Sequence, residues 1–198
     1  MFMTLARQVC QGLLFRWDAL WVPFYLRQSG VRMLGRCFFS GTPVISMAPE
    51  SHITLDAGGR YLSRTFSTAL GVSHPLVLRT LAPGARIHIG KEVGISGGSI
   101  CAATAITIGD HVLLGADTLI ADTDFHPLSA VDRAAATPPA SQAVHIESHV
   151  FLGARSVVLK GVTIGKGSVI GAGSLVTKSI PPDSLAAGNP CRVIRSLR

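Results

Sequence analysis

The chain has 198 residues, of which 47% are hydrophobic and 15% are charged, so it is long enough for one domain with a sizeable core. Its formal net charge of +7 suits a polyanionic partner such as a phosphate-bearing cofactor. Nucleic acid is disfavoured, because the chain has no Lys/Arg-rich run and only 6% aromatic residues. The 21 glycines do not fall at every third position, which excludes a collagen-like chain.

Cysteine usage and hydropathy predict a cytoplasmic protein. The cysteines lie far apart without a C-x-x-C pair, which is typical of reduced, packed thiols: Cys10, Cys37, Cys101 and Cys191. A secretory signal is not evident, because Arg16 and Asp18 interrupt the early apolar stretch. The chain also contains no run of the roughly 18 apolar residues needed to span a bilayer.

The first forty residues predict an amphipathic helical segment over 1–40. Arg7, Gln11 and Asp18 fall on one face, and Pro23 is expected to bend or end the helix. Apolar residues recur at helical spacing on another face: Cys10, Leu14, Trp17, Trp21 and Phe24. Five arginines against one acid give the segment a local charge of +4. Trp and Arg together suit peripheral contact with a membrane, and the alternative is that the helix covers the open end of the domain that follows or a partner subunit.

A six-residue repeat occupies most of the remaining chain. An aliphatic residue followed by a small one begins IGDHVL at Ile108, LGADTL at Leu114 and IGKGSV at Ile164. This period matches neither a helix nor a plain strand, and it predicts a short strand followed by a corner. Three such sides would close one turn, and neighbouring turns would lie about 4.8 Å apart with the aliphatic residues stacked inside. The sequence therefore predicts a mainly β protein, a parallel β-helix of about four to five turns over residues 41–198.

The repeat breaks between about residues 126 and 145, which predicts a protruding loop. Three prolines and many small residues fill this stretch. Asp122, Asp124 and His126 stand at alternate positions just before it, so they would share one face if the strand continued. A neutral imidazole takes up a proton near neutral pH, and a carboxylate can orient it. The pattern thus indicates a general base at the break, and the alternative is that His126 only caps the edge of a turn.

The repeat resembles the hexapeptide-repeat acyltransferases, which form left-handed parallel β-helices. TDFHP, ending at Pro127, resembles the histidine-proline motif of the sugar and xenobiotic O-acetyltransferases, and the stretch 100–128 resembles a subgroup associated with surface-polysaccharide acetylation. The resemblance implies an acetyl-coenzyme A-dependent O-acetyltransferase for a sugar or glycan precursor, assembled as a homotrimer. His126 would be the general base, with Asp124 or Asp122 assisting, and acetyl transfer would be direct, without a covalent intermediate.

The C-terminal stretch carries the second part of the resemblance, through VTKSIPP and GNPCRVIR. It implies a coenzyme A site in a groove between two subunits, without a metal. The residues at matching positions are Phe151, Ala154, Ala172, Thr177, Lys178 and Arg192. Lys and Arg can supply charge-assisted bonds to the cofactor's phosphates. Some sugar acetyltransferases place an asparagine near the position of Gly97, so the acceptor pocket is expected to differ here.

Three other functions are open at this stage, and a fourth is disfavoured. N-acetylation of an amino sugar would use the same site. A zinc enzyme of the γ-carbonic anhydrase type would draw its ligands from His111, His126, His145 and His149, although their spacing departs from that family. A non-catalytic β-helix scaffold would bind no coenzyme A. A dinucleotide site at GKGSVIGAG, residues 165–173, is explained better by the repeat, because its glycines occupy second positions of hexads.

Overall fold

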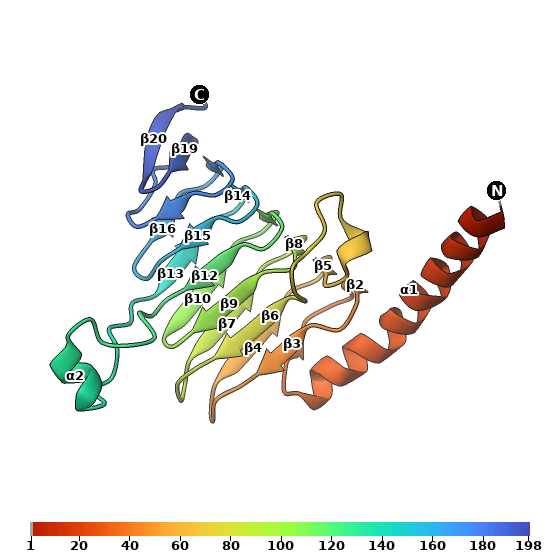
Figure 1. Ribbon diagram of the computed structural model, residues 1–198, viewed down its shortest axis with the longest axis horizontal. Helices are drawn as coiled ribbons and strands as arrows, with labels where there is room; N and C mark the ends of the chain where they lie inside the picture. The colour runs from red at the N-terminus through yellow and green to blue at the C-terminus, as the bar shows by residue number, and fades with distance from the viewer. Residues whose placement is uncertain (1) are drawn as a thin grey trace.

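The protein is a three-sided prism with one long helix at its end (Figure 1). A computed structural model describes residues 2–198, with side chains described from Gln11 onward. Helix α1 (Phe2–Gln28) lies across the end of the prism where the strands begin, and the C-terminus lies at the opposite end. Within these described residues, no helix is both long and apolar enough to cross a membrane.

Each side of the prism is a sheet whose strands come from successive turns of the chain. Sheet A contains β1 (Arg32–Met33), β4 (His52–Leu55), β7 (Arg86–Ile89), β10 (Ala105–Ile108), β13 (Val144–Ile146) and β16 (Thr163–Ile164). Sheet B contains β2 (Phe38–Ser40), β5 (Arg60–Leu62), β8 (Gly94–Ser96), β11 (Leu113–Leu114), β14 (Phe151–Leu152), β17 (Val169–Ile170), β19 (Ser184–Gly188) and β20 (Cys191–Ser196). Sheet C contains β3 (Val44–Ser46), β6 (Val77–Thr80), β9 (Ser99–Ala102), β12 (Leu119–Ala121), β15 (Val157–Val158) and β18 (Leu175–Val176).

The chain passes from sheet A to sheet B to sheet C and back, six times, before β19 and β20 end it. Neighbouring strands are parallel throughout, except that β19 and β20 form an antiparallel pair. The predicted parallel β-helix is confirmed, with six turns where four to five were expected. Counting six-residue repeats in the sequence underestimated the number of turns, because the sides of the turns over residues 32–80 do not keep the six-residue register.

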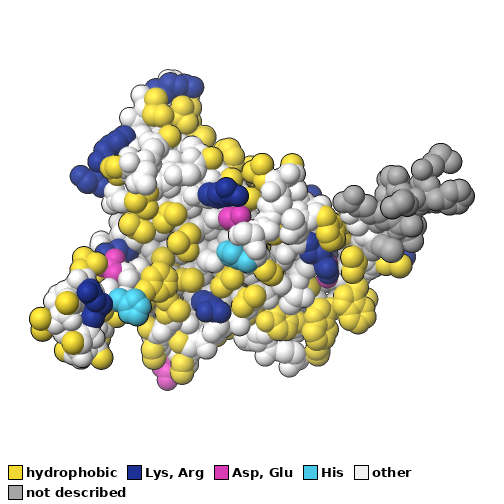
Figure 2. Space-filling model, viewed as in Figure 1, with side chains coloured by type: hydrophobic (Ala, Val, Ile, Leu, Met, Phe, Trp, Pro, Cys, Tyr) yellow, Lys and Arg dark blue, Asp and Glu magenta, His cyan; other side chains and the backbone are white. Residues whose placement is uncertain are grey.

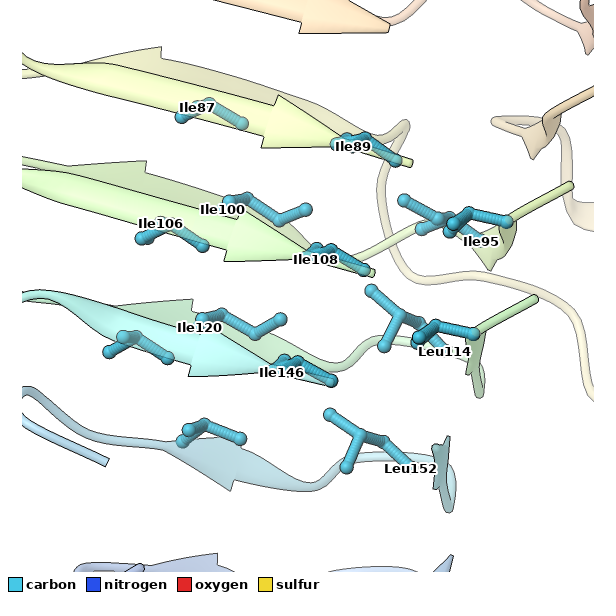
Figure 3. Close-up of a cluster of buried hydrophobic side chains, with 14 of the residues drawn as sticks. Ile87, Ile89, Ile95, Ile100, Ile106, Ile108, Leu114, Ile120, Ile146 and Leu152 are labelled. Atoms are coloured by element: carbon cyan, nitrogen blue, oxygen red, sulfur yellow. The ribbon is translucent and has the colours of Figure 1, made fainter. Parts of the chain in front are cut away.

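The core is a set of aliphatic columns, as the repeat predicts. In sheet A, Leu55, Ile89, Ile108 and Ile146 are paired in register. The side chains of Ile89, Ile108 and Ile146 stack inside the prism (Figure 3). Ile95, Leu114 and Leu152 form the corresponding column of sheet B. Burial of each such side chain contributes about 1.5–3 kcal/mol. Since each turn covers its neighbours, the prism is stabilised only as a stack.

The small second position of the hexads follows from crowding at the corners. A Cβ added to Gly115 would lie 2.5 Å from the backbone nitrogen of Ala154 in the next turn. The left-handed backbone occurs two positions later instead, at Asp117 (φ 59°) and Arg155 (φ 58°). Glycine at Gly115 is therefore required by the close approach of two turns.

Helix α1 packs on the prism with a different face from the one that its hydrophobic pattern suggests. Val22 and Leu26 are fully buried, and so is Asp18, which the sequence placed on the polar face. Asp18 accepts two hydrogen bonds from Arg64, at 2.7 and 3.1 Å, and one from the N–H of Gly41 at 2.8 Å. Exposed apolar side chains occupy the outward side: Leu13, Trp17, Leu20, Trp21 and Phe24. Pro23 lies inside the helix without ending it.

Candidate active site

His126 is presented by a tight turn at the start of the predicted loop. Strand β12 ends at Ala121, and the chain leaves the prism until β13, with a short helix α2 (Ala130–Ala134) in between (Figure 1). The N–H of His126 donates to the carbonyl of Asp124 at 2.7 Å, and Phe125 has a φ of 60°, which is unusual for a bulky residue. The turn leaves the His126 side chain exposed at the corner between sheets C and A.

Asp122 anchors this turn to the prism. Its side chain is fully buried, and its two carboxylate oxygens accept the N–H groups of Ala103 at 2.6 Å and Thr104 at 2.8 Å. These donors belong to the corner between β9 and β10 in the preceding turn. A buried carboxylate that accepts two backbone N–H groups is held firmly in place. Asp122 therefore fixes the base of the loop.

Asp124 contacts Lys160, a residue that the sequence analysis did not single out. Its carboxylate forms an ion pair with Lys160 Nζ at 2.5 Å, and both side chains are partly exposed. Lys160 follows β15, the strand that pairs with β12 in the next turn. The signal was present, because aligning the hexads places Lys160 beside the segment of Asp122 to Asp124. The two aspartates and His126 would share one face only if the strand continued, and this condition is not met, because β12 ends at Ala121 and Phe125 has a φ of 60°.

The residues matched to coenzyme A lie along two edges of sheet C. Ala154 and Ala172 lie at the corner between sheets B and C, in a groove of about 440 Å³. The groove is lined by Leu70, Gly71, Ala116, Asp117, Ala154, Arg155, Ala172 and Gly173. Thr177 and Lys178 are exposed at the other corner, between sheets C and A, two turns beyond His126. Within one chain, sheet C therefore separates the alanine groove from His126.

The remaining two matched residues lie on sheet B. Phe151 is on the outer face, 43% exposed, beside a hollow of about 310 Å³ that also contacts Arg60 and Leu113. Arg192 is exposed on β20, where its Nη1 donates to the carbonyl of Cys191 at 2.8 Å. Lys and Arg side chains gather at this end of the molecule (Figure 2). The basic end is suited to binding phosphate groups.

The described cysteines are packed thiols. Burial raises the pKa of Cys37, Cys101 and Cys191, although neighbouring hydrogen bonds or arginines oppose the shift. A raised pKa keeps a thiol protonated, so these side chains are poor nucleophiles at neutral pH. Covalent catalysis through cysteine is thus disfavoured.

The histidines proposed as zinc ligands are dispersed over the prism. His111 and His149 stack with ring centroids 4.9 Å apart at the corner between sheets A and B. His145 lies on the outer face of sheet A, and His126 lies at the corner between sheets C and A. Among the side chains from Gln11 to Arg198, no three His, Cys, Asp or Glu residues are grouped to hold a metal ion. The stretch 165–173 consists of β17 and two corners, without a helix.

The fold defines a class of architecture: a chain of hexapeptide repeats wound into a left-handed parallel β-helix. Residues 143–178 match the family model described as the hexapeptide repeat of succinyl-transferase. The resemblance to sugar O-acetyltransferases is likewise confirmed at the level of sequence.

Three relatives make this likeness concrete. The chain is 49% identical over 94 residues to a galactoside O-acetyltransferase of Lactococcus lactis, covering 48% of this chain and 44% of the relative. A solved galactoside acetyltransferase in complex with coenzyme A is 41% identical, with a TM-score of 0.54 over 57% of this chain and 56% of that one. A hexapeptide-repeat acetyltransferase of Vibrio cholerae, complexed with acetyl coenzyme A, is 26% identical, with a TM-score of 0.58 over 95% and 85%. The chain thus spans about half the length, or less, of the curated relatives it matches.

Proposed function

We propose that the protein is an acetyl-coenzyme A-dependent O-acetyltransferase that acts on a hydroxyl of a sugar or surface-polysaccharide precursor. The observation that carries this proposal is an exposed imidazole on a turn anchored by a buried carboxylate, in a chain similar to galactoside O-acetyltransferases. Two of its solved relatives contain coenzyme A or acetyl coenzyme A. The basic end around Arg192 offers charge for the cofactor's phosphates.

In the proposed mechanism His126 takes the proton from the acceptor hydroxyl. The oxygen attacks the carbonyl carbon of the acetyl thioester, the carbon–sulfur bond breaks, and coenzyme A leaves as the thiol. General-base catalysis of this kind accounts for about 10²–10⁴-fold in rate. Asp122 positions the turn, while Asp124, paired with Lys160, holds the loop against the next turn of the prism.

A homotrimer would bring the two halves of the site together. Sheet C has a mainly apolar outer face, where Val77, Ser99, Leu119, Val157 and Leu175 are in register. Three copies with this face toward a common axis would set the B–C corner of each copy beside the C–A corner of the next. The alanine groove of one copy would then face His126, Thr177 and Lys178 of its neighbour.

The activity is tested by thiol release from acetyl coenzyme A with a panel of sugars, amino sugars and lipid-linked glycans. We expect turnover with a hydroxyl acceptor, and a fall of roughly 10²–10⁴-fold in kcat for His126→Ala with coenzyme A binding retained in calorimetry. His145→Ala, an exposed histidine on sheet A, is the matched control and should keep the wild-type rate. Equal activity of His126→Ala would remove the general base from the mechanism, and lost cofactor binding would reassign His126 to that role.

The outer side of α1 supports peripheral contact with the inner face of the membrane. Trp17 is 63% exposed and Leu20 77% exposed, beside Trp21 and Phe24. The sole acid among residues 11–40 is Asp18, and it is buried. The arginines of this segment are exposed: Arg16, Arg27, Arg32 and Arg36. Aromatic and basic side chains on one helix match an anionic lipid surface, whereas a second copy would bring like charges together.

Vesicle flotation tests this contact. The intact protein should float with vesicles containing anionic lipid and much less with zwitterionic ones, because the exposed charges among residues 11–40 are basic. Trp17→Ser with Leu20→Ser should reduce flotation, since both side chains are exposed and their loss leaves the fold intact. Flotation that ignores lipid charge or survives this double substitution would argue against membrane contact.

A further inference from the structure

The corner between β5 and β6 is far longer than the equivalent corners of later turns. Residues 63–76 separate these strands, whereas four residues suffice between β11 and β12 (115–118) and between β14 and β15 (153–156). This β5–β6 loop contains a short 3-10 helix, η1 (Thr65–Ser67). Long connections in compact domains are commonly functional. Since four residues are enough to close the corner, the extra length of the loop indicates a function other than closing the prism.

The β5–β6 loop is packed against the prism at both ends. Val72 and Leu76 are buried, and Thr65 Oγ1 donates to the carbonyl of Val72 at 3.2 Å. A Cβ added to Gly97 would lie 2.8 Å from the Val72 Cβ and 2.9 Å from the carbonyl oxygen of His74. A side chain at Gly97 would therefore clash with the loop, and the φ of 61° at this position also favours glycine. The loop occupies the space near Gly97 in which a larger side chain would otherwise stand.

The tip of the loop forms one end wall of the alanine groove. Leu70 and Gly71 line the groove together with Ala154 and Ala172, and Leu70 is 77% exposed. The N–H of Ser73 donates to Asp117 Oδ1 at 2.9 Å, which ties the loop to the groove. The second carboxylate oxygen of Asp117 remains available to accept a hydroxyl hydrogen bond. The wall thus combines an apolar side chain with a hydrogen-bond acceptor.

This end of the groove is at the same height along the prism as His126. Asp117 lies between β11 and β12, and His126 follows β12, so both belong to the fourth turn. The basic end formed by β19 and β20 is two turns away, in the direction of Ala172. A coenzyme A molecule with its phosphates at the basic end would therefore direct its thioester toward the loop.

We infer that the β5–β6 loop of one copy and His126 of the neighbouring copy enclose the acceptor sugar, with Leu70 against the sugar ring and Asp117 accepting one of its hydroxyl groups. This inference rests on the proposed function. Sugar rings have apolar faces and a hydroxyl rim, which is the chemistry that the wall presents. The loop is then the specificity-determining segment of the site.

Steady-state kinetics separate this role from cofactor binding. Leu70→Ala and Asp117→Asn should each raise the KM for the acceptor by roughly tenfold, the discrimination expected from one lost contact. The KM for acetyl coenzyme A should stay within about twofold for these variants, because the basic end and the alanines are unchanged. Leu34→Ala, 54% exposed at the far end of the prism, is the control and should leave both constants unchanged. An unchanged acceptor KM for both Leu70→Ala and Asp117→Asn overturns the inference while leaving the proposed function intact.

Subunit mixing tests the shared site directly. At an acceptor concentration well below KM, homotrimers of His126→Ala and of Leu70→Asp should both be impaired, and co-expressed chains should regain about a quarter of the wild-type rate, the statistical share of interfaces with both intact residues. If mixing restores nothing, His126 and Leu70 act in the same chain and the inference is wrong. If wild-type protein releases no thiol with any acceptor, the proposed function fails and the inference fails with it.

Discussion

At the scale of single residues, the sequence predicted which side chains form the site, and the structure shows which partners two of them contact. The break in the repeat led to His126 and its two aspartates, and the structure puts all three in one turn. The division of labour between the aspartates depends on partners far along the chain: Asp122 contacts a corner 18 and 19 residues earlier, and Asp124 pairs with Lys160, 36 residues later. Only the register between turns of the prism brings such residues together. The spacing of residues within the segment 122–126 therefore could not reveal these contacts.

Asp122→Ala should destabilise the protein and disable the turn together. The substitution leaves the N–H groups of Ala103 and Thr104 without their acceptor in a buried place. Buried bonds to a charged group are worth about 1.5–3 kcal/mol, so the free energy of unfolding should fall by at least that amount in urea titration. Turnover should fall as well, because the turn that carries His126 is no longer anchored to the prism.

Asp132→Ala, an exposed acid in the same loop, is the control for this prediction and should change the free energy of unfolding by less than about 0.5 kcal/mol. A variant at Asp122 as stable as the wild type would mean that water or a rearranged backbone satisfies the two N–H groups. In that case the anchoring role of Asp122 would have to be abandoned.

At the scale of elements, the clearest predictions came from the strictest periodicity. The hexads gave the strands from β7 onward, because an aliphatic side chain and a crowded corner recur together. The first two turns were missed, since the β5–β6 loop and other irregular corners hide the period. Helix α1 was found from its pattern, but its buried face was not. Asp18 looked like a solvent-facing residue because its partner Arg64 is 46 residues away.

The pair of Asp18 and Arg64 should be strongly coupled in holding α1 to the prism. Breaking a buried ion pair by removing one partner costs about 3–5 kcal/mol, because the other charge remains without compensation. Asp18→Ala and Arg64→Ala should therefore each lower stability, as followed by urea unfolding with tryptophan fluorescence. Arg64→Ala falls at the upper end of this range because it leaves the buried carboxylate of Asp18, whereas Asp18→Ala leaves Arg64, which is partly exposed to water.

A double-mutant cycle separates this coupling from simple loss of packing. The double variant should cost less than the sum of the two single substitutions, since neither charge is left alone. Additive losses would show that Asp18 acts through the N–H of Gly41 alone. Helix α1 would then be attached mainly by Val22 and Leu26.

At the scale of the whole molecule, the proposed site is distributed over two edges of one sheet, so the proposed chemistry would require assembly. Within one prism, sheet C lies between the alanine groove and His126. The sequence could imply a trimer only by resemblance. The structure adds a physical reason, the mainly apolar outer face of sheet C flanked by the two halves of the site.

Val157→Lys should therefore separate the copies and abolish turnover in the same step. Val157 lies on the outer face of sheet C, one strand in from its edge, in register with Leu119 and Leu175. Placing three lysines around a common axis would oppose association by charge repulsion and by the cost of burying an ammonium group. Sedimentation should show the monomer, while circular dichroism retains the β-sheet signal. Thr107→Lys on the outer face of sheet A should remain assembled and active, and a Val157→Lys protein that stays both trimeric and active would place the interface on another side of the prism.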